Sequence, residues 1–237
     1  MKQSLKILNP EGLYSHEQLK ATLILFLGAF IPAFHRYFGS ISFARKTFPF
    51  FGEFESSLYM FVTAFVLMGV IPGVLVTLVF KESLRDYGLI LGDWRRGLKV
   101  SIILLILIAG VLLYPASQTQ EMRFSFPFDK AISESAFYFF RFQILRGLFF
   151  YIAWEFFFRG FMLFGLRESF GDWPAICVQV IPSCLWHIGM PVGEIFSSLL
   201  AGFLFGIIAI RTRSIIWVFF MHYLIGVILD FFIVLSM

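Results

Sequence analysis

Two charged residues stand inside one of the most apolar stretches of this chain. In "YIAWEFFFRGFMLFGL", residues 151–166, Glu155 and Arg159 are four residues apart. On a helix this spacing places both side chains on one face. Because a charge at the centre of a bilayer costs roughly 2.5–3.5 kcal/mol on insertion scales, the pair indicates either a mutual ion pair or a function.

Two histidines follow in later apolar stretches. His187 lies in "SCLWHIGMP" and His222 in "FFMHYLIG". A lone histidine of this kind often bonds only a backbone carbonyl at a helix end. Counted at about 1.5 Å of rise per residue, however, Glu155 and both histidines fall at comparable depths. We therefore expect three helices to bring these side chains to one pocket.

One carboxylate, two imidazoles and a guanidinium in a dry cavity suit amide hydrolysis. A carboxylate removed from water is a stronger base, so Glu155 could take a proton from an attacking water. His187 and His222 would stabilise the tetrahedral intermediate and its leaving amine, while Arg159 orients the glutamate. These four are the predicted catalytic residues.

Two more carboxylates are candidates for a supporting role. Asp230 follows His222 by eight residues, on nearly the same helix face, and could orient it or remain near the surface. Glu194 follows the "GMPVG" turn and is either an interfacial carboxylate or a group that reaches back to His187.

A metal mechanism is the alternative for the same residues. Glu155, His187 and His222 could form a three-ligand zinc site, but the chain has no H-E-x-x-H spacing. We expect no metal and no other cofactor. Ser183 lacks a nucleophile-elbow pattern, so a serine mechanism is not expected.

The elements that position these residues are predicted to be membrane helices. The 237 residues are 59% hydrophobic and 14% charged, against about 45–50% and 25% in ordinary globular domains. We expect an all-α, polytopic membrane helix bundle of about seven transmembrane helices. The apolar runs near the 20-residue length of a span are 21–38, 57–80, 100–117, 136–167, 173–189, 193–210 and 214–236.

Two of these runs are irregular. The fourth is long, and Arg141 and Arg146 in its first half predict that this half reaches the headgroups while about 148–167 crosses the membrane. The fifth is short for a span and contains Pro182, which predicts a kink.

The whole chain, 1–237, is expected to be a single integral membrane domain. Its parts are a polar N-terminal segment (1–20), a cytoplasmic interfacial loop (81–99) in which Gly92-Asp93 offers a helix start, and a core that bears the motifs (136–236). Most Lys and Arg residues fall on one side if the N-terminus is cytoplasmic. The net charge of +4 includes no basic tract, so membrane lipids and not nucleic acid are the expected partners. Cys177 and Cys184, seven residues apart on one helix, are too distant for a disulfide.

The same residues resemble the motifs of a known family. "WEFFFRG", "SCLWH" and "HYLIG" resemble the Glu-Glu-x-x-x-Arg, Phe-x-x-x-His and His-x-x-x-Asn motifs of the CAAX-protease and bacteriocin-processing (Abi) family of intramembrane peptidases. The segment 199–226 and "LILGDWRRGL" resemble further parts of it, so the resemblance covers about 81–230.

Three positions depart from the family pattern. Trp154 stands where the family has its first glutamate, Ser183 where it has phenylalanine and Gly226 where it has asparagine. Because of this position, Trp154 is predicted as a further supporting residue of the site. Either Glu155 takes the role of base, with Asp230 or Glu194 filling the missing polar position, or the chain keeps the fold without peptidase activity.

The resemblance implies an intramembrane endopeptidase of a bacterial plasma membrane. Its substrate would be a membrane-associated peptide, prenylated or hydrophobic near its C-terminus. The alternative is a catalytically inactive relative that acts as a membrane immunity, assembly or peptide-binding protein. A small transporter is disfavoured because the sequence shows no inverted repeat.

Overall fold

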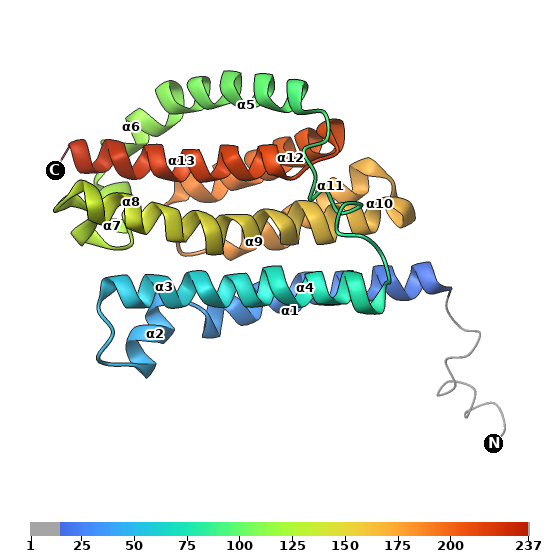
Figure 1. The fold of residues 1–237 in the computed structure, drawn as a ribbon. Coiled ribbons are helices and arrows are strands. Elements are labelled where there is room, and N and C mark those ends of the chain that lie inside the picture. The colour runs from blue at the N-terminus through green and yellow to red at the C-terminus, as the bar shows by residue number, and fades with distance from the viewer. Residues whose placement is uncertain (1–14, 237) are drawn as a thin grey trace.

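The structure, a computed structural model, describes residues 15–236, so residues 1–14 of the polar N-terminal segment lie outside the described residues. Within 15–236 the regular secondary structure is helical (Figure 1). The α-helices are α1 (His16–Phe38), α2 (Ile41–Thr47), α3 (Glu53–Ala64), α4 (Ile71–Val74), α5 (Trp94–Ile108), α6 (Tyr114–Ser117), α7 (Gln120–Ser125), α8 (Ala136–Leu145), α9 (Ile152–Glu155), α10 (Gly165–Phe170), α11 (Asp172–Trp186), α12 (Val192–Thr212) and α13 (Ile216–Leu235). Wider π-helical turns join α3 to α4, α5 to α6, and α8 through α9 to α10.

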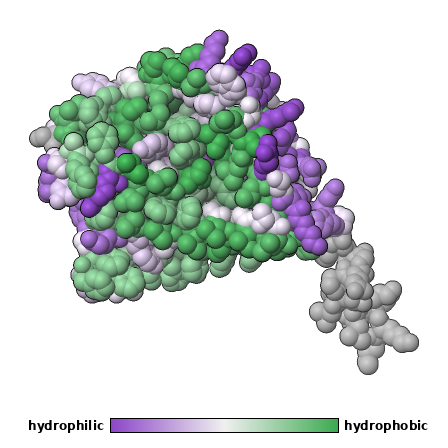
Figure 2. Space-filling model, viewed as in Figure 1, coloured by the Kyte–Doolittle hydropathy of each residue, from purple (hydrophilic) through white to green (hydrophobic). Residues whose placement is uncertain are grey.

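Six helices within the described residues are long and apolar enough to cross a membrane. They are His16–Phe38, Glu53–Val79, Trp94–Ser117, Ala136–Phe170, Val192–Thr212 and Ile216–Leu235. The expected all-α polytopic membrane bundle is confirmed. Figure 2 agrees, since hydrophobic residues cover the middle of the visible face and hydrophilic residues lie toward the ends of the helices.

The fifth apolar run is the one that does not reach this length. It forms α11, a helix of 15 residues that continues through Pro182 and ends at Trp186. Its start is tied to the end of α10 by the Arg167–Asp172 ion pair of 2.7 Å. Its end lies beside the end of α1, where the Trp186 indole donates to His35 at 3.3 Å. The bundle therefore has six candidate spans within the described residues, against about seven expected. The helix α11, with 15 residues, is shorter than the length of a span.

The helix Ala136–Phe170 is the core of the bundle. It is the most buried of the candidate spans, because it lies between the layer of α1, α3 and α4 and the layer of α12 and α13 (Figure 1). Its first half was predicted to reach the headgroups, and this stays a prediction. Arg146 in that half is buried and forms a 2.8 Å ion pair with Asp230, so its charge is paired within the protein. Arg141 is exposed and stacks on the Phe54 ring.

The loop before α5 docks on the turn between α12 and α13. Asp93 caps α5 as expected, because its side chain accepts from the Arg96 backbone N–H at 3.1 Å. The Asp93 backbone N–H donates to the Thr212 carbonyl at 2.8 Å. Gly92 next to it has a φ of 53°, a conformation that glycine adopts without the strain of a side chain.

Candidate functional site

Glu155 is the centre of a buried polar cluster. It ends α9, its side chain is 0% exposed, and its Oε1 accepts from Arg159 at 3.2 Å and from His222 Nδ1 at 2.6 Å. Arg159 lies one turn further along the same helix and is also buried. Three of the four predicted catalytic residues therefore contact one another, through a single carboxylate oxygen.

His222 is the member of this cluster whose side chain is partly exposed. It lies in α13 and its side chain is 23% exposed. Because a carboxylate only accepts, the 2.6 Å contact requires the proton on His222 Nδ1. The neutral ring then has a lone pair on Nε2 that is free to bind a water or to take its proton.

His187 lies near this cluster without contacting Glu155. It follows α11, and its Nδ1 donates to the Ser183 carbonyl at 2.8 Å, the contact expected of a histidine at a helix end. The Trp154 indole packs edge-on against both imidazoles, with ring centroids 5.6 Å from His187 and 6.5 Å from His222. Trp154, predicted as a supporting residue, is thus a buried spacer between the two histidines.

The two predicted supporting carboxylates lie elsewhere. Asp230 does not orient His222, because its Oδ2 accepts from Arg146 at 2.8 Å and from Gln143 at 2.7 Å. Glu194 lies in the first turn of α12. Within residues 15–236 its buried Oε2 has no hydrogen-bond partner, so a bond to His187 through this atom is not formed.

These contacts form an ordered polar seam between the helix Ala136–Phe170 and α13. We define the polar seam by three successive pairs: Arg146–Asp230, Tyr151–Gly226 and Glu155–His222. The positions descend by four on α13 while they rise by four or five on the other helix, as required for antiparallel helices. Sequence reasoning missed Arg146 as a partner and missed Tyr151 altogether. The spacing of four residues from Tyr151 to Glu155 was the available signal.

The zinc alternative does not fit this geometry. Glu155 Oε1 and His222 Nδ1 are 2.6 Å apart, whereas two ligands of one zinc ion each lie about 2 Å from the metal and therefore further from each other. Within the described residues, no group of three or more His, Cys, Asp or Glu side chains could hold a metal ion. Cys177 and Cys184 are both free.

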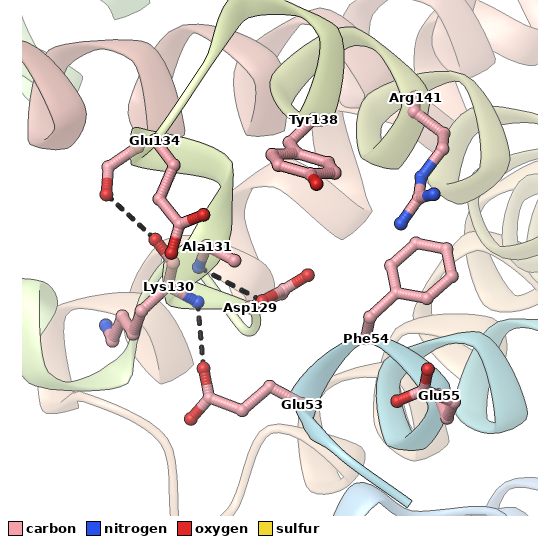
Figure 3. Close-up of a pocket in the computed structure, with 10 residues that line it drawn as sticks. Glu53, Phe54, Glu55, Asp129, Lys130, Ala131, Glu134, Tyr138 and Arg141 are labelled. Atoms are coloured by element: carbon pink, nitrogen blue, oxygen red, sulfur yellow. Dashed lines mark hydrogen bonds between the residues drawn. The ribbon is translucent and has the colours of Figure 1, made fainter.

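A crevice of the molecule lies at a different place (Figure 3). Its volume is about 670 Å³, and Glu53, Asp129 and Arg141 are among its lining residues. Asp129 is turned into the crevice and also accepts from the Ala131 backbone N–H. Burial raises the pKa of the Asp129 carboxyl above its ordinary value. Arg141 precedes Glu155 by 14 residues, about 21 Å along the helix, so this crevice is separate from the Glu155 cluster.

Comparison with known families gives one match. Residues 131–228 match the family described as type II CAAX prenyl endopeptidase Rce1-like. This segment is similar to the Rce1-like family. It begins just before α8 and ends within α13, so it contains all four predicted catalytic residues. The resemblance expected over 81–130 lies outside the match. No curated protein and no solved structure matches the chain significantly.

Proposed function

We propose that this protein is an intramembrane endopeptidase. It hydrolyses a peptide bond in a membrane-associated peptide, near a prenylated or hydrophobic C-terminal segment. The observation that carries the proposal is the 2.6 Å hydrogen bond between Glu155 and His222, with one partner buried and the other partly exposed, inside the segment that is similar to the Rce1-like family. A buried carboxylate that orients an accessible imidazole is a standard arrangement for moving a proton.

In the proposed reaction Glu155 activates water through His222. The Nε2 of His222 takes a proton from the water, and the water oxygen forms a bond to the peptide carbonyl carbon. The Glu155 carboxylate stabilises the imidazolium that results. When the C–N bond breaks, the imidazolium returns the proton to the leaving amine. Arg159 holds Glu155 in place through their 3.2 Å contact.

The role proposed here for His187 differs from the predicted one, which was to stabilise the tetrahedral intermediate and its leaving amine. Its Nδ1 proton is used by the Ser183 carbonyl, so the neutral ring presents an acceptor at Nε2. It is therefore suited to accept from a substrate N–H or from the attacking water. It is not suited to donate to the oxyanion of the tetrahedral intermediate.

The orientation in the membrane belongs to the same proposal. Basic residues gather at the end of the bundle where α1 begins and α12 ends, and cytoplasmic loops carry an excess of Lys and Arg. Those of this end include Lys81, Arg85, Arg95, Arg96, Arg167, Arg211 and Arg213. We place this end, and with it the N-terminus, in the cytoplasm, and we assign the protein to a bacterial plasma membrane.

The test is cleavage by the purified protein in lipid vesicles. The probe is a quenched fluorescent peptide whose C-terminal segment carries a farnesylated cysteine. The wild type should release fluorescence, and Glu155→Gln should abolish the release because the variant cannot stabilise the imidazolium. The matched control is Glu168→Gln, which changes a 73% exposed carboxylate in the same long helix and should cleave as the wild type does. Full cleavage by Glu155→Gln would refute the assignment.

A second candidate is a peptide-binding relative without catalysis. Trp154 favours it, because this buried indole fills the space between the two imidazoles at the position where the resembled family has a glutamate. On this hypothesis the wild type does not cleave the probe, and Trp154→Glu gains cleavage by supplying the missing carboxylate. Cleavage by the wild type that is lost in Glu155→Gln decides for the peptidase.

A further inference from the structure

Tyr151 occupies the middle position of the polar seam. It precedes Glu155 by four residues, and Gly226 follows His222 by four residues, so the two form the next pair along the same antiparallel helices. A Cβ atom built at position 226 would overlap the Tyr151 hydroxyl. The absence of a side chain on Gly226 is therefore what allows this hydroxyl to reach α13.

The Tyr151 side chain is held from two sides. Its ring packs edge-on against His222, with centroids 4.8 Å apart, and the Arg146 guanidinium carbon lies 5.1 Å from the ring centroid. Arg146 is itself fixed by Asp230. The residue is buried, so the orientation of the hydroxyl is set by its neighbours and not by solvent.

The proposed hydrolysis needs a hydrogen-bond donor for its oxyanion, which neither His187 nor His222 supplies in the proposed scheme. A tetrahedral intermediate develops an oxyanion, which hydrogen-bond donors must stabilise. His187 presents an acceptor, and His222 uses Nδ1 for Glu155 and Nε2 for the proton of water. Arg159 directs an N–H to Glu155 and is buried with it. The Tyr151 ring lies against the His222 ring, and its hydroxyl, an O–H donor, lies beside Gly226, one helical turn from His222.

We propose that Tyr151 is a catalytic residue of the peptidase reaction and donates a hydrogen bond to the oxyanion from its hydroxyl, which occupies the space beside Gly226. This inference rests on the proposed function and deepens it. The proton of Tyr151 is shared with the oxyanion and is not transferred, so the balance of the hydrolysis is unchanged.

The test is the kinetics of Tyr151→Phe on the farnesylated probe in vesicles. Because the donor acts on the intermediate and not on the bound substrate, kcat should fall by about 10²–10³-fold while KM changes little. The matched control is Tyr223→Phe. Tyr223 also packs against Tyr151, at 6.0 Å between ring centroids, but follows His222 by only one residue and so lies on another face of α13, and its variant should keep the wild-type kcat.

A second variant tests whether the position of the Tyr151 hydroxyl matters, and not only its presence. Gly226→Ala keeps Tyr151 and displaces the hydroxyl, so kcat should fall as in Tyr151→Phe, and the double variant should lose no more than either single one. Unchanged kcat in Tyr151→Phe, with cleavage still lost in Glu155→Gln, overturns this inference and leaves the proposed function standing. Unchanged cleavage in Glu155→Gln overturns both.

Discussion

Asp230 and Arg146 form a 2.8 Å ion pair in which the aspartate side chain is 0% exposed. The two residues lie 84 positions apart in the sequence. The pair joins α13 to the central helix, and it is the pair of the polar seam next to Tyr151–Gly226. It therefore fixes the register of the polar seam, and with it the contact between Glu155 and His222.

Loss of one partner of this pair should destabilise the fold strongly. Asp230→Asn leaves the Arg146 charge buried without its counter-ion, and breaking a buried pair in this way costs about 3–5 kcal/mol. Unfolding in a denaturing detergent series measures the change. The double variant Asp230→Asn/Arg146→Gln should recover part of the loss, because neither charge remains buried alone. Additive losses in the double variant would show that the two charges do not depend on each other.

Arg159 should matter for stability as well as for cleavage. Arg159→Gln leaves Glu155 ionised in a dry site with only His222 to bind it, so we expect a loss of about 3–5 kcal/mol. Arg167→Gln is the matched control, because Arg167 lies two turns further along the same helix and its ion pair with Asp172 is partly exposed. It should cost about 0–1 kcal/mol. Equal losses in the two variants would contradict the role assigned to Arg159.

The glycine at position 92 should be intolerant of substitution. Its φ of 53° and the Thr212 carbonyl, which overlaps the position of an added Cβ atom, both exclude a side chain. Gly92→Ala should destabilise the protein by about 1–3 kcal/mol, the cost of a strained backbone residue. Gly110→Ala is the control, since no atom lies within 4 Å of its added Cβ, and it should be neutral or stabilising. The thermal midpoint of each variant checks the contrast.

The acid stability of the protein should depend on Glu82. Burial alone would raise the pKa of this carboxyl, but hydrogen bonds from Lys20 at 2.8 Å and from the Tyr87 hydroxyl outweigh it and lower the pKa below its ordinary value of 4.5. A lowered native pKa means that the ionised form stabilises the fold. This contribution is complete above pH 4.5 and is lost as the pH falls through the lowered native pKa.

Thermal midpoints at pH 7 and at pH 3 measure this effect. The wild type should lose more stability between the two values than Glu82→Gln, which has no carboxyl to protonate. Glu134→Gln, which changes an exposed carboxylate, should follow the wild type. An identical loss of stability at pH 3 in wild type and Glu82→Gln would show that the hydrogen bonds of Lys20 and Tyr87 to Glu82 do not cause the acid sensitivity.

The contact between Glu155 and His222 could be predicted because isolated charge in hydrocarbon is costly. This cost predicted that helices far apart in the sequence converge, and together with the order of the motifs it indicated the family. The position of His187 was predicted less well. Its distance from Glu155 depends on the packing of the Trp154 indole between the imidazoles, and the spacing of residues in the sequence does not show how such a ring packs.

The Arg146–Asp230 pair could not be predicted in the same way. Arg141 and Arg146 were both interpreted as signs that this part of the helix reaches the headgroups, and the sequence did not show that Arg146 has a buried counter-ion on a distant helix. The shortness of α11 was visible in the sequence, yet its end at Trp186 depends on contacts with α1 that spacing alone does not show.

The most direct test of the account is the coupling between Glu155 and His222. The cleavage rates of Glu155→Gln, His222→Gln and the double variant are compared in vesicles that contain equal amounts of folded protein. Residues that act as one unit give non-additive losses, so the account predicts that the double variant is no slower than the slower single variant. Losses that multiply in the double variant, or wild-type rates in either single one, would contradict it.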